Sequence, residues 1–271
     1  MDNVNYYNQS ELWKDNINNR ELIRFQEIIR VVPRNISSLL DIGCGNGQLL
    51  KFLLQQLEIP NLFGIDISLT ALKIAKNMAP NAIFLYASAD KLPFEDKSFD
   101  IIIASEVLEH LPYKVYEQTL KEISRVSKKY ILITVPNNED LKRTYIRCPY
   151  CGCIFSRCRH LRSFNEDILK VLFKNYQFKV KILREIGPIT RLYPKIILKI
   201  AIKLKILSLI SHGHPVCPQC GWRPERRNHI YKEHRNNIKR KGIFFKFDFF
   251  KKFISKTTKP WLLCLYERND G

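Results

Sequence analysis

The sequence predicts an α/β fold of the doubly wound type, which is a mostly parallel sheet with helices on both faces. Two observations carry this prediction. Apolar runs of strand length alternate with stretches of helical length, and a glycine-rich turn joins the first apolar run to the first helix. The predicted strands span residues 37–42, 62–67, 82–86, 98–105, 130–135, 178–186 and 261–267, and the predicted helices span 48–57 and 164–176.

The glycine-rich turn indicates a cofactor site. It reads D-I-G-C-G-N-G from Asp41 to Gly47, and its glycines allow the backbone to approach a ligand at the N-terminus of the following helix. Dinucleotide-binding folds use the spacing G-x-G-x-x-G to hold a pyrophosphate, whereas this turn has G-x-G-x-G behind an acid. We therefore expect a nucleotide-like cofactor that carries no phosphate groups.

A second acid extends the predicted cofactor site. Asp66 ends the second predicted strand, about 20 residues beyond the glycine turn, where a carboxylate can accept hydrogen bonds from both hydroxyls of a ribose. The sequence therefore predicts a cofactor that contains a nucleoside.

Four segments in this order resemble one family. They are D-I-G-C-G-N-G, G-I-D-I-S, A-D-K-L-P-F-E-D-K-S-F-D and S-E-V-L-E-H-L, and together they are similar to the small-molecule branch of the class I S-adenosylmethionine-dependent methyltransferases. The resemblance covers residues 39–135 tightly. It implies a Rossmann-like, doubly wound sheet of seven strands, S-adenosylmethionine as cofactor, and a methyltransferase activity.

The same resemblance implies a role for individual residues. The methionine part of the cofactor is expected at Asp41, Gly43 and Gly45, the ribose at Asp66 with Ile67 beside it, and the adenine at Ala89 and Asp90. Ser105 and Glu106 are expected to form the floor beneath the sulfonium.

The candidate catalytic residues are Glu106, Glu109 and His110. They follow the fourth predicted strand at helical offsets, which places them near one face beside the methyl donor, where one could deprotonate an acceptor hydroxyl. The segment E-V-L-E-H also resembles one that gathers a divalent metal in quinone-type O-methyltransferases, although we favour a site without metal. For His110, a capping or packing role is as well supported as a catalytic one.

Two C-P-x-C-G segments predict a zinc site. They supply Cys148, Cys151, Cys217 and Cys220, and four thiolates complete a tetrahedral, structural zinc site of the zinc-ribbon type. The two halves lie much farther apart than the usual spacing of about 15 to 20 residues, so the fold must bring them together. Spare candidate ligands are Cys153, Cys158 and His160, whereas Cys44 and Cys264 are expected to be unpaired thiols.

The predicted organisation is a core with two insertions. Residues 1–138 form the S-adenosylmethionine-binding core with an N-terminal helical segment, and 139–163 form the first zinc-knuckle insertion. Residues 164–186 add a core helix and the sixth strand, 187–259 form a second, basic insertion with the other zinc knuckle, and 260–271 contain the seventh strand and the C-terminus.

The charge is strongly basic. The 271 residues contain 45 Lys and Arg against 26 Asp and Glu, a formal net charge of +19 that is concentrated after about Lys142. An anionic partner is therefore expected, and nucleic acid, anionic lipid and phosphorylated sugars all qualify. The polar start, 1–19, does not read as a secretory signal, and eight cysteines without a disulfide pattern favour the cytoplasm.

Two segments of the basic half could contact a surface. Residues 194–211 are apolar with lysines at four-residue intervals, which suits either an interfacial helix at the inner face of a membrane or, slightly better, a helix packed on the core. Residues 244–253 alternate aromatic and basic side chains, which could stack on bases or enter lipid.

The leading functional hypothesis is methylation of a hydroxyl or amine on a small or lipid-linked saccharide-type acceptor, with the zinc-stapled insertions as a lid. The alternatives are an RNA methyltransferase and a non-catalytic, methyltransferase-like adaptor that binds a partner through its basic zinc module. Val135-Pro136-Asn137-Asn138 lacks the acid or Asn followed by Pro-Pro and an aromatic that nucleic-acid amino methyltransferases often carry, and the intact cofactor motif disfavours an adaptor.

Overall fold

The structure is a computed structural model that describes residues 3–13, 17–192, 217–222 and 256–269. The chain divides into two compact units. The first unit combines Met1–Tyr145, Arg159–Pro188 and Lys259–Gly271, and the second combines Ile146–Cys158 and Ile189–Thr258. Each unit is described separately below.

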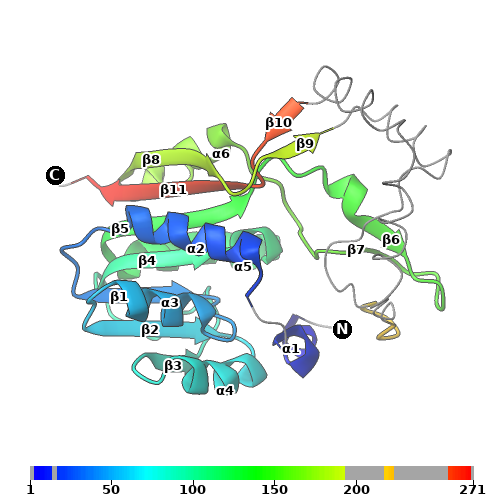
Figure 1. Cartoon of the computed structure of the whole chain (residues 1–271), viewed down its shortest axis with the longest axis horizontal. Coiled ribbons are helices and arrows are strands. Elements are labelled where there is room, and N and C mark those ends of the chain that lie inside the picture. Colours follow the sequence, from blue (N-terminus) through cyan, green and yellow to red (C-terminus); the bar gives the residue numbers. More distant parts are fainter. Residues whose placement is uncertain (1–2, 14–16, 193–216, 223–255, 270–271) are drawn as a thin grey trace, which may run out of the picture. The chain divides into compact units, whose positions relative to one another are not determined.

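The first unit is built on a seven-stranded sheet (Figure 1). Its strands lie in the order β3-β2-β1-β4-β5-β11-β8, with the first five parallel and β11 antiparallel to both of its neighbours. This confirms the predicted doubly wound, seven-stranded fold. The strands are β1 (Ser38–Ile42), β2 (Asn61–Asp66), β3 (Ile83–Tyr86), β4 (Phe99–Ser105), β5 (Ser127–Pro136), β8 (Phe178–Ile186) and β11 (Trp261–Arg268).

Strand order decides where a ligand can bind. The connections run outward from β1 through β2 to β3, and then return to the other side of β1 with β4 and β5. In open α/β sheets, ligands bind beyond the carboxyl ends of the strands where the order reverses. That position lies between β1 and β4, and the glycine turn and the segment that follows β4 both start there.

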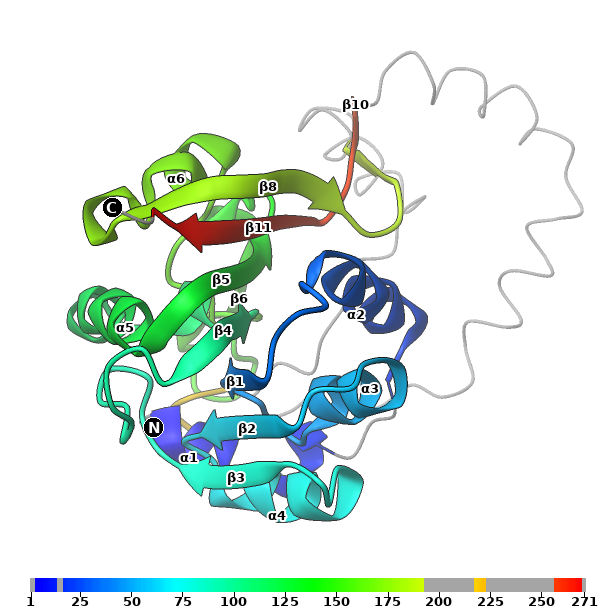
Figure 2. The same cartoon turned by 90° about the vertical axis from the view of Figure 1, so that its left-hand side faces the viewer.

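Helices cover both faces of the sheet (Figure 2). Helices α2 (Asn19–Val31) and α3 (Gln48–Gln56) pack on one face, with α4 (Leu69–Met78) in the same apolar cluster. Helices α5 (Tyr113–Val126) and α6 (Glu166–Val171) pack on the other. The short helical elements of this unit are α1 (Asn3–Tyr7), η1 (Ser10–Trp13), η2 (Leu108–His110), η3 (Leu141–Thr144) and η4 (Lys174–Tyr176).

The central strands are apolar on both faces because each face is covered by helices. On β1, Leu39 points into the cluster under α2 and α3, and the next residue, Leu40, points into the cluster under α5. On β4, Ile101 and Ile102 divide between the same two clusters, and all four side chains are fully buried. An unbroken apolar run is therefore what a central parallel strand requires.

The helix predicted for 164–176 is shorter in the structure. It begins at Glu166, because the side chain of Asn165 accepts a hydrogen bond from the backbone of Ile168 at 2.8 Å and caps the first turn. It ends at Val171 and is followed by the separate 3-10 turn η4, which Gln177 closes with a left-handed φ of 63°. An apolar pattern can continue through such an interruption, so periodicity alone overestimates the length.

Two small two-stranded sheets, β6-β7 and β10-β9, lie outside the seven-stranded sheet. Strands β6 (Tyr145–Arg147) and β7 (Ile154–Ser156) flank the first cysteine segment, and β9 (Thr190–Leu192) pairs antiparallel with β10 (Lys256–Thr258). The segments 194–211 and 244–253, for which surface contacts were predicted, lie outside the described residues. Within the described part of the chain, no helix is long and apolar enough to cross a bilayer.

Asp100 at the start of β4 fixes the beginning of β1. One of its carboxylate oxygens accepts hydrogen bonds from the Ser37 backbone and hydroxyl, each at 2.8 Å, and from the Ser38 backbone at 3.1 Å. Partial burial opposes ionisation, but these hydrogen bonds and the neighbouring Lys128 lower the pKa of Asp100 overall. The carboxylate therefore stabilises the folded state at neutral pH.

We predict that Asp100→Asn lowers the free energy of unfolding by about 1–2 kcal/mol at pH 7. Because the folded-state pKa is depressed, this difference should be present above about pH 4 and disappear as the wild-type carboxylate is protonated at lower pH. Chemical denaturation at several pH values measures it. Asp96→Asn, which removes an exposed ion pair with Arg125, is the matched control, and an equal loss in both variants would contradict the prediction.

Candidate functional site

The glycine turn between β1 and α3 adopts a conformation that favours glycine. Gly43, Gly45 and Gly47 all have left-handed φ angles, of 68°, 53° and 79°. A Cβ on Gly43 would lie 2.6 Å from the Val107 side chain, and one on Gly45 would lie 2.7 Å from the Trp13 ring. The predicted cofactor loop therefore has no room for a side chain at Gly43 or Gly45, because a Cβ atom there would displace a neighbouring side chain.

Asp66 holds the glycine turn in place. Its carboxylate accepts a hydrogen bond from the backbone of Gly45 at 2.9 Å and another from the backbone of Ser68 at 2.8 Å. The side chain thus joins the residues that follow β2 to the glycine turn. Asp66 is 8% exposed. A residue expected from the resemblance to bind a ribose thus also positions the loop that precedes it.

Asp41 and Asp66 place two carboxyl groups at the same edge of the sheet. Asp41 lies on β1 and is 2% exposed. Burial raises the pKa of Asp41 well above its ordinary value, and the nearby Asp66 raises it further, whereas Arg24 acts in the opposite direction. Burial also raises the pKa of Asp66. A cationic group bound at this edge would therefore be favoured by both carboxyl groups.

The N-terminal segment covers this edge of the sheet. Figure 1 shows α1 beside the carboxyl ends of the parallel strands, and hydrogen bonds hold it there. The Ser68 hydroxyl donates to the Tyr7 carbonyl at 2.8 Å, and the Asn46 side chain donates to the Trp13 carbonyl at 3.3 Å. Sequence reasoning missed this cover, and its only sequence signal is a few aromatic residues in a polar stretch.

The remaining predicted cofactor residues surround the same edge. Ile67 follows Asp66 and is half-buried, and Ala89 is buried after β3. Asp90 accepts a hydrogen bond from the Ser88 hydroxyl. At the end of β4, the Ser105 hydroxyl lies 2.8 Å from that of Thr134 on β5. These residues lie on separate loops at the carboxyl ends of β2, β3 and β4.

Glu106 begins the segment after β4 in a strained conformation. Its φ is 59°, which is unusual for a residue other than glycine. The carboxylate accepts a hydrogen bond from the Trp261 indole at 2.8 Å and lies 3.4 Å from the Arg24 guanidinium. The Arg24 guanidinium also stacks over the Trp261 ring, 5.0 Å from its centroid. Glu106 is thus fastened to α2 and β11, a pairing that the sequence does not predict.

Glu109, His110 and His160 form a second group at this edge. One potential ligand atom from each lies within 4.8 Å of the others, and the two imidazole rings are edge to face with centroids 4.7 Å apart. Burial raises the pKa of Glu109 well above its ordinary value, and Glu106 adds to this. Burial, followed by the influence of His160, lowers the pKa of His110 to about 3. His160, predicted as a spare zinc ligand, therefore lies with the candidate catalytic residues instead.

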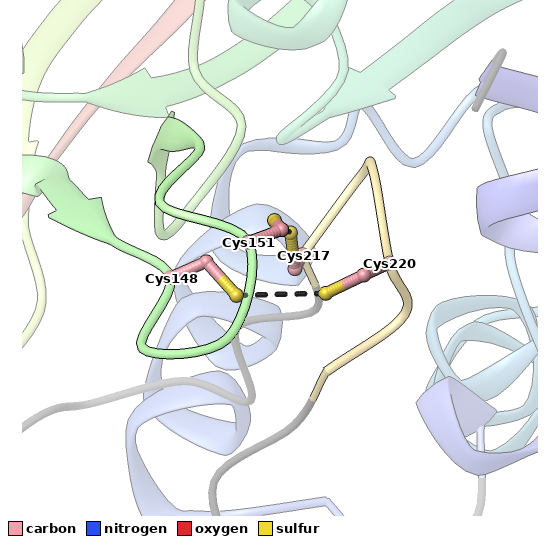
Figure 3. A group of neighbouring side chains, drawn as sticks. All are labelled: Cys148, Cys151, Cys217 and Cys220. Atoms are coloured by element: carbon pink, nitrogen blue, oxygen red, sulfur yellow. Dashed lines mark hydrogen bonds between the residues drawn. The ribbon is translucent and has the colours of Figure 1, made fainter.

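Four cysteines of the second unit come together as the sequence predicts (Figure 3). The sulfur atoms of Cys148 and Cys220 are 3.5 Å apart, and those of Cys151 and Cys217 are also 3.5 Å apart. A tetrahedral zinc ion with bonds of about 2.3 Å separates its sulfur ligands by about 3.8 Å. The donor set and the spacing therefore fit zinc, whereas Cys153 and Cys158 are not part of the group.

The two cysteine segments share one backbone turn. In each, the glycine after the second cysteine donates its N–H to the carbonyl of the first, over 3.1 Å from Gly152 and 3.0 Å from Gly221. Both glycines have left-handed φ angles, of 73° and 72°. Burial opposes ionisation of the Cys217 thiol, but backbone N–H groups of the turn lower the pKa of Cys217 to about 6. The turn thus favours the thiolate form that binds metals.

Comparison with known proteins shows that part of the first unit is similar to methyltransferases. Residues 40–132 match the methyltransferase domain family. An uncharacterized protein of Methanocaldococcus jannaschii is 37% identical over 142 residues, which are 51% of this chain and 53% of the relative. The ubiquinone/menaquinone biosynthesis C-methyltransferase UbiE of Campylobacter jejuni is 30% identical over 115 residues, 41% of this chain and 48% of that one. The chain thus spans about half the length of the curated relatives it matches.

Solved structures with low sequence identity to this chain share its fold. A chain in the complex that contains the Haloferax volcanii Trm112 methyltransferase activator is 15% identical, with a TM-score of 0.56 over 98% of this chain and 96% of that one. The match supports the fold alone. The methyltransferase domain match covers residues 40–132, which include the glycine turn and the segment after β4.

We predict that Asp66→Ala weakens S-adenosylmethionine binding by about tenfold or more, because it removes the predicted ribose contact and releases the glycine turn. Two backbone N–H groups also lose their acceptor, which should cost about 1–3 kcal/mol of folding free energy. Calorimetric titration and thermal unfolding measure the two effects. With Asp96→Ala as the control, unchanged affinity in Asp66→Ala would sink the ribose assignment.

Proposed function

We propose that the protein transfers the methyl group of S-adenosylmethionine to a hydroxyl or amine of a small or lipid-linked saccharide-type acceptor. The observation that carries a hydroxyl or amine acceptor is the pair formed by the buried Glu109 carboxyl group and the half-buried His110 imidazole, shortly after β4. The saccharide class rests on the family resemblance and on the basic, apolar segment 194–211, which lies outside the described residues. A peripheral membrane contact through that segment stays a prediction, as does a cytoplasmic location.

The loop geometry fits the cofactor. The left-handed backbone at Gly43 and Gly45 exposes a surface without side chains, and Asp41 supplies a buried carboxyl group for the amino group of the methionine part. Asp66 would accept the ribose hydroxyls with the lone pairs that its two backbone hydrogen bonds leave available. Ile67, Ala89, Asp90 and Ser105 would complete the cofactor site. S-adenosylmethionine supplies an activated methyl group on a sulfonium.

The acceptor is expected beside the segment after β4. Methyl transfer is an in-line displacement, so the protein mainly has to orient the acceptor and control its proton. Glu106 is engaged by Arg24 and Trp261, which suits positioning. Because burial keeps the His110 imidazole neutral, one of its two ring nitrogens retains a lone pair that can accept a hydrogen bond from a hydroxyl. We therefore propose Glu109 and His110 as the groups that act on the acceptor, with Glu106 holding the segment.

We also propose that Cys148, Cys151, Cys217 and Cys220 bind one structural zinc ion. Four thiolates would leave no position for water, so the ion would join the two cysteine segments and take no part in methyl transfer. The paired turns and the sulfur distances support this proposal.

We predict that Cys217→Ser lowers the zinc content of the purified protein from about one equivalent toward zero, because the remaining three thiolates bind zinc weakly. Zinc content is measured by inductively coupled plasma mass spectrometry, and stability by thermal unfolding. Cys158→Ser lies outside the four-sulfur group and is the matched control. Full zinc content in Cys217→Ser would contradict the ligand set.

A transfer assay tests the acceptor class. Methyl-labelled S-adenosylmethionine and the protein are incubated with an extract of the cells that make it, and the products are separated into lipid, nucleic acid and small solutes. Label in lipid-linked or free saccharide is the expected result. Label in nuclease-sensitive material would contradict the saccharide acceptor and favour RNA methylation. The absence of any S-adenosylmethionine binding would favour a non-catalytic adaptor.

A further inference from the structure

We propose that the second unit docks on the surface of an anionic lipid bilayer, with Tyr150 and Ile154 entering the boundary between headgroups and acyl chains. The inference deepens the proposed function, and it rests on that function only for the claim that the lipid-linked acceptor lies in the same bilayer. The docking surface is built from described residues, and it is separate from the contact predicted for 194–211.

The first support is the division of charge between the two units. The second unit, which combines Ile146–Cys158 and Ile189–Thr258, contains 19 of the 45 Lys and Arg but only 3 of the 26 Asp and Glu. Its formal net charge is therefore +16, which leaves +3 for the first unit. A unit this basic attracts polyanions, of which anionic lipid surfaces and nucleic acids are the common kinds.

The second support is the exposure of large apolar side chains on this basic unit. Tyr150 is 80% exposed, Ile154 is 59% exposed and Ile189 is 72% exposed. The described part of the unit, residues 146–158, 189–192, 217–222 and 256–258, contains no Asp or Glu. Exposed apolar side chains in a basic setting are typical of surfaces that lie on a membrane.

The two cysteine segments bring an aromatic pair together. Their four cysteines meet (Figure 3), and the rings of Tyr150 and Trp222 lie with centroids 6.4 Å apart at an interplanar angle of 44°. Trp222 packs against the buried cluster of the unit, and its carbonyl accepts the Cys217 N–H at 2.9 Å. Tyr150 is therefore an exposed ring beside an anchored one. Tyr and Trp rings favour the membrane–water boundary, because each has an apolar body and a polar group.

The isoleucines favour lipid over nucleic acid. In β7, Phe155 is buried in the cluster of the unit, and the preceding Ile154 is exposed, as alternation along a strand requires. Aromatic rings can stack on nucleobases, but an isoleucine side chain has no ring for such a contact. Covering it with acyl chains removes apolar area from water. The exposed Ile154 and Ile189 thus indicate that the polyanion is a lipid surface.

Docking would bring the enzyme to its acceptor. A lipid-linked saccharide stays in the bilayer, so a protein bound to the same surface meets it at a raised effective concentration. The attraction between the basic unit and anionic headgroups is screened by salt, whereas the apolar contact of Tyr150 and Ile154 is not. The two contributions can therefore be measured separately.

Co-sedimentation with lipid vesicles tests the docking surface, using the full-length protein with zinc bound to the cysteines. We expect vesicles of phosphatidylcholine with about one third phosphatidylglycerol to bind the protein about tenfold more tightly than vesicles of phosphatidylcholine alone, and added salt to weaken this binding. The double variant Tyr150→Ala/Ile154→Ala should bind the anionic vesicles about tenfold more weakly than the wild type.

The matched control is Tyr113→Ala/Val171→Ala. It removes two side chains of the first unit that are 74% and 59% exposed, close to the values of the two that the docking variant removes. Its vesicle binding should equal that of the wild type. Zinc content and thermal unfolding, measured in parallel, verify that both variants are folded.

The docking surface would be overturned by equal binding to anionic and neutral vesicles, or by the same vesicle affinity in the two double variants. It would also be overturned if polyuridylate RNA bound more tightly than the vesicles and lost affinity in Tyr150→Ala/Ile154→Ala, because the same side chains would then serve nucleic acid. None of these results concerns the saccharide acceptor, which the transfer assay tests. If anionic vesicles bind as expected while that assay labels nuclease-sensitive material, the proposed function fails and the docking surface remains.

Discussion

The carboxylate of Asp66 is the interaction on which the proposed cofactor site depends. It joins the end of β2 to the glycine turn that follows β1, through one hydrogen bond to each side. The turn's left-handed glycines leave its backbone without side-chain cover. The carboxylate holds this backbone together with the Cys44 N–H, which donates to the Ile65 carbonyl at 2.9 Å. A single buried acid thus links the strand order of the sheet to the shape of the surface that a cofactor would contact.

Several ionisable groups gather at the carboxyl edge of the sheet. Asp41, Asp66, Glu106 and Glu109 come from β1, β2 and the segment after β4, and burial raises the pKa of each. Such an arrangement favours cationic ligands, because a bound positive charge relieves the cost of burying carboxylates. The sulfonium and amino groups of S-adenosylmethionine both have the charge that this edge favours.

The sequence predicts the fold and much of the cofactor loop, because both depend on short local patterns. Strands such as 130–135 follow from apolar runs, and the glycine turn needs its residues at fixed spacing. The two cysteine segments are also recognisable, since each repeats C-P-x-C-G. Long-range partners are not encoded locally: the contact of Trp261 with Glu106 and the approach of His160 to Glu109 arise only when the sheet and the insertion are assembled.

The central claim is that the edge defined by the glycine turn and Asp66 binds S-adenosylmethionine for methyl transfer. The most direct measurement is a crystal structure of the protein grown with S-adenosylhomocysteine. The account predicts the ligand against Gly43 and Gly45, with its ribose hydroxyls on Asp66 and its sulfur facing the segment after β4. A ligand bound elsewhere, or a saturating concentration that leaves this edge without ligand density, would contradict it.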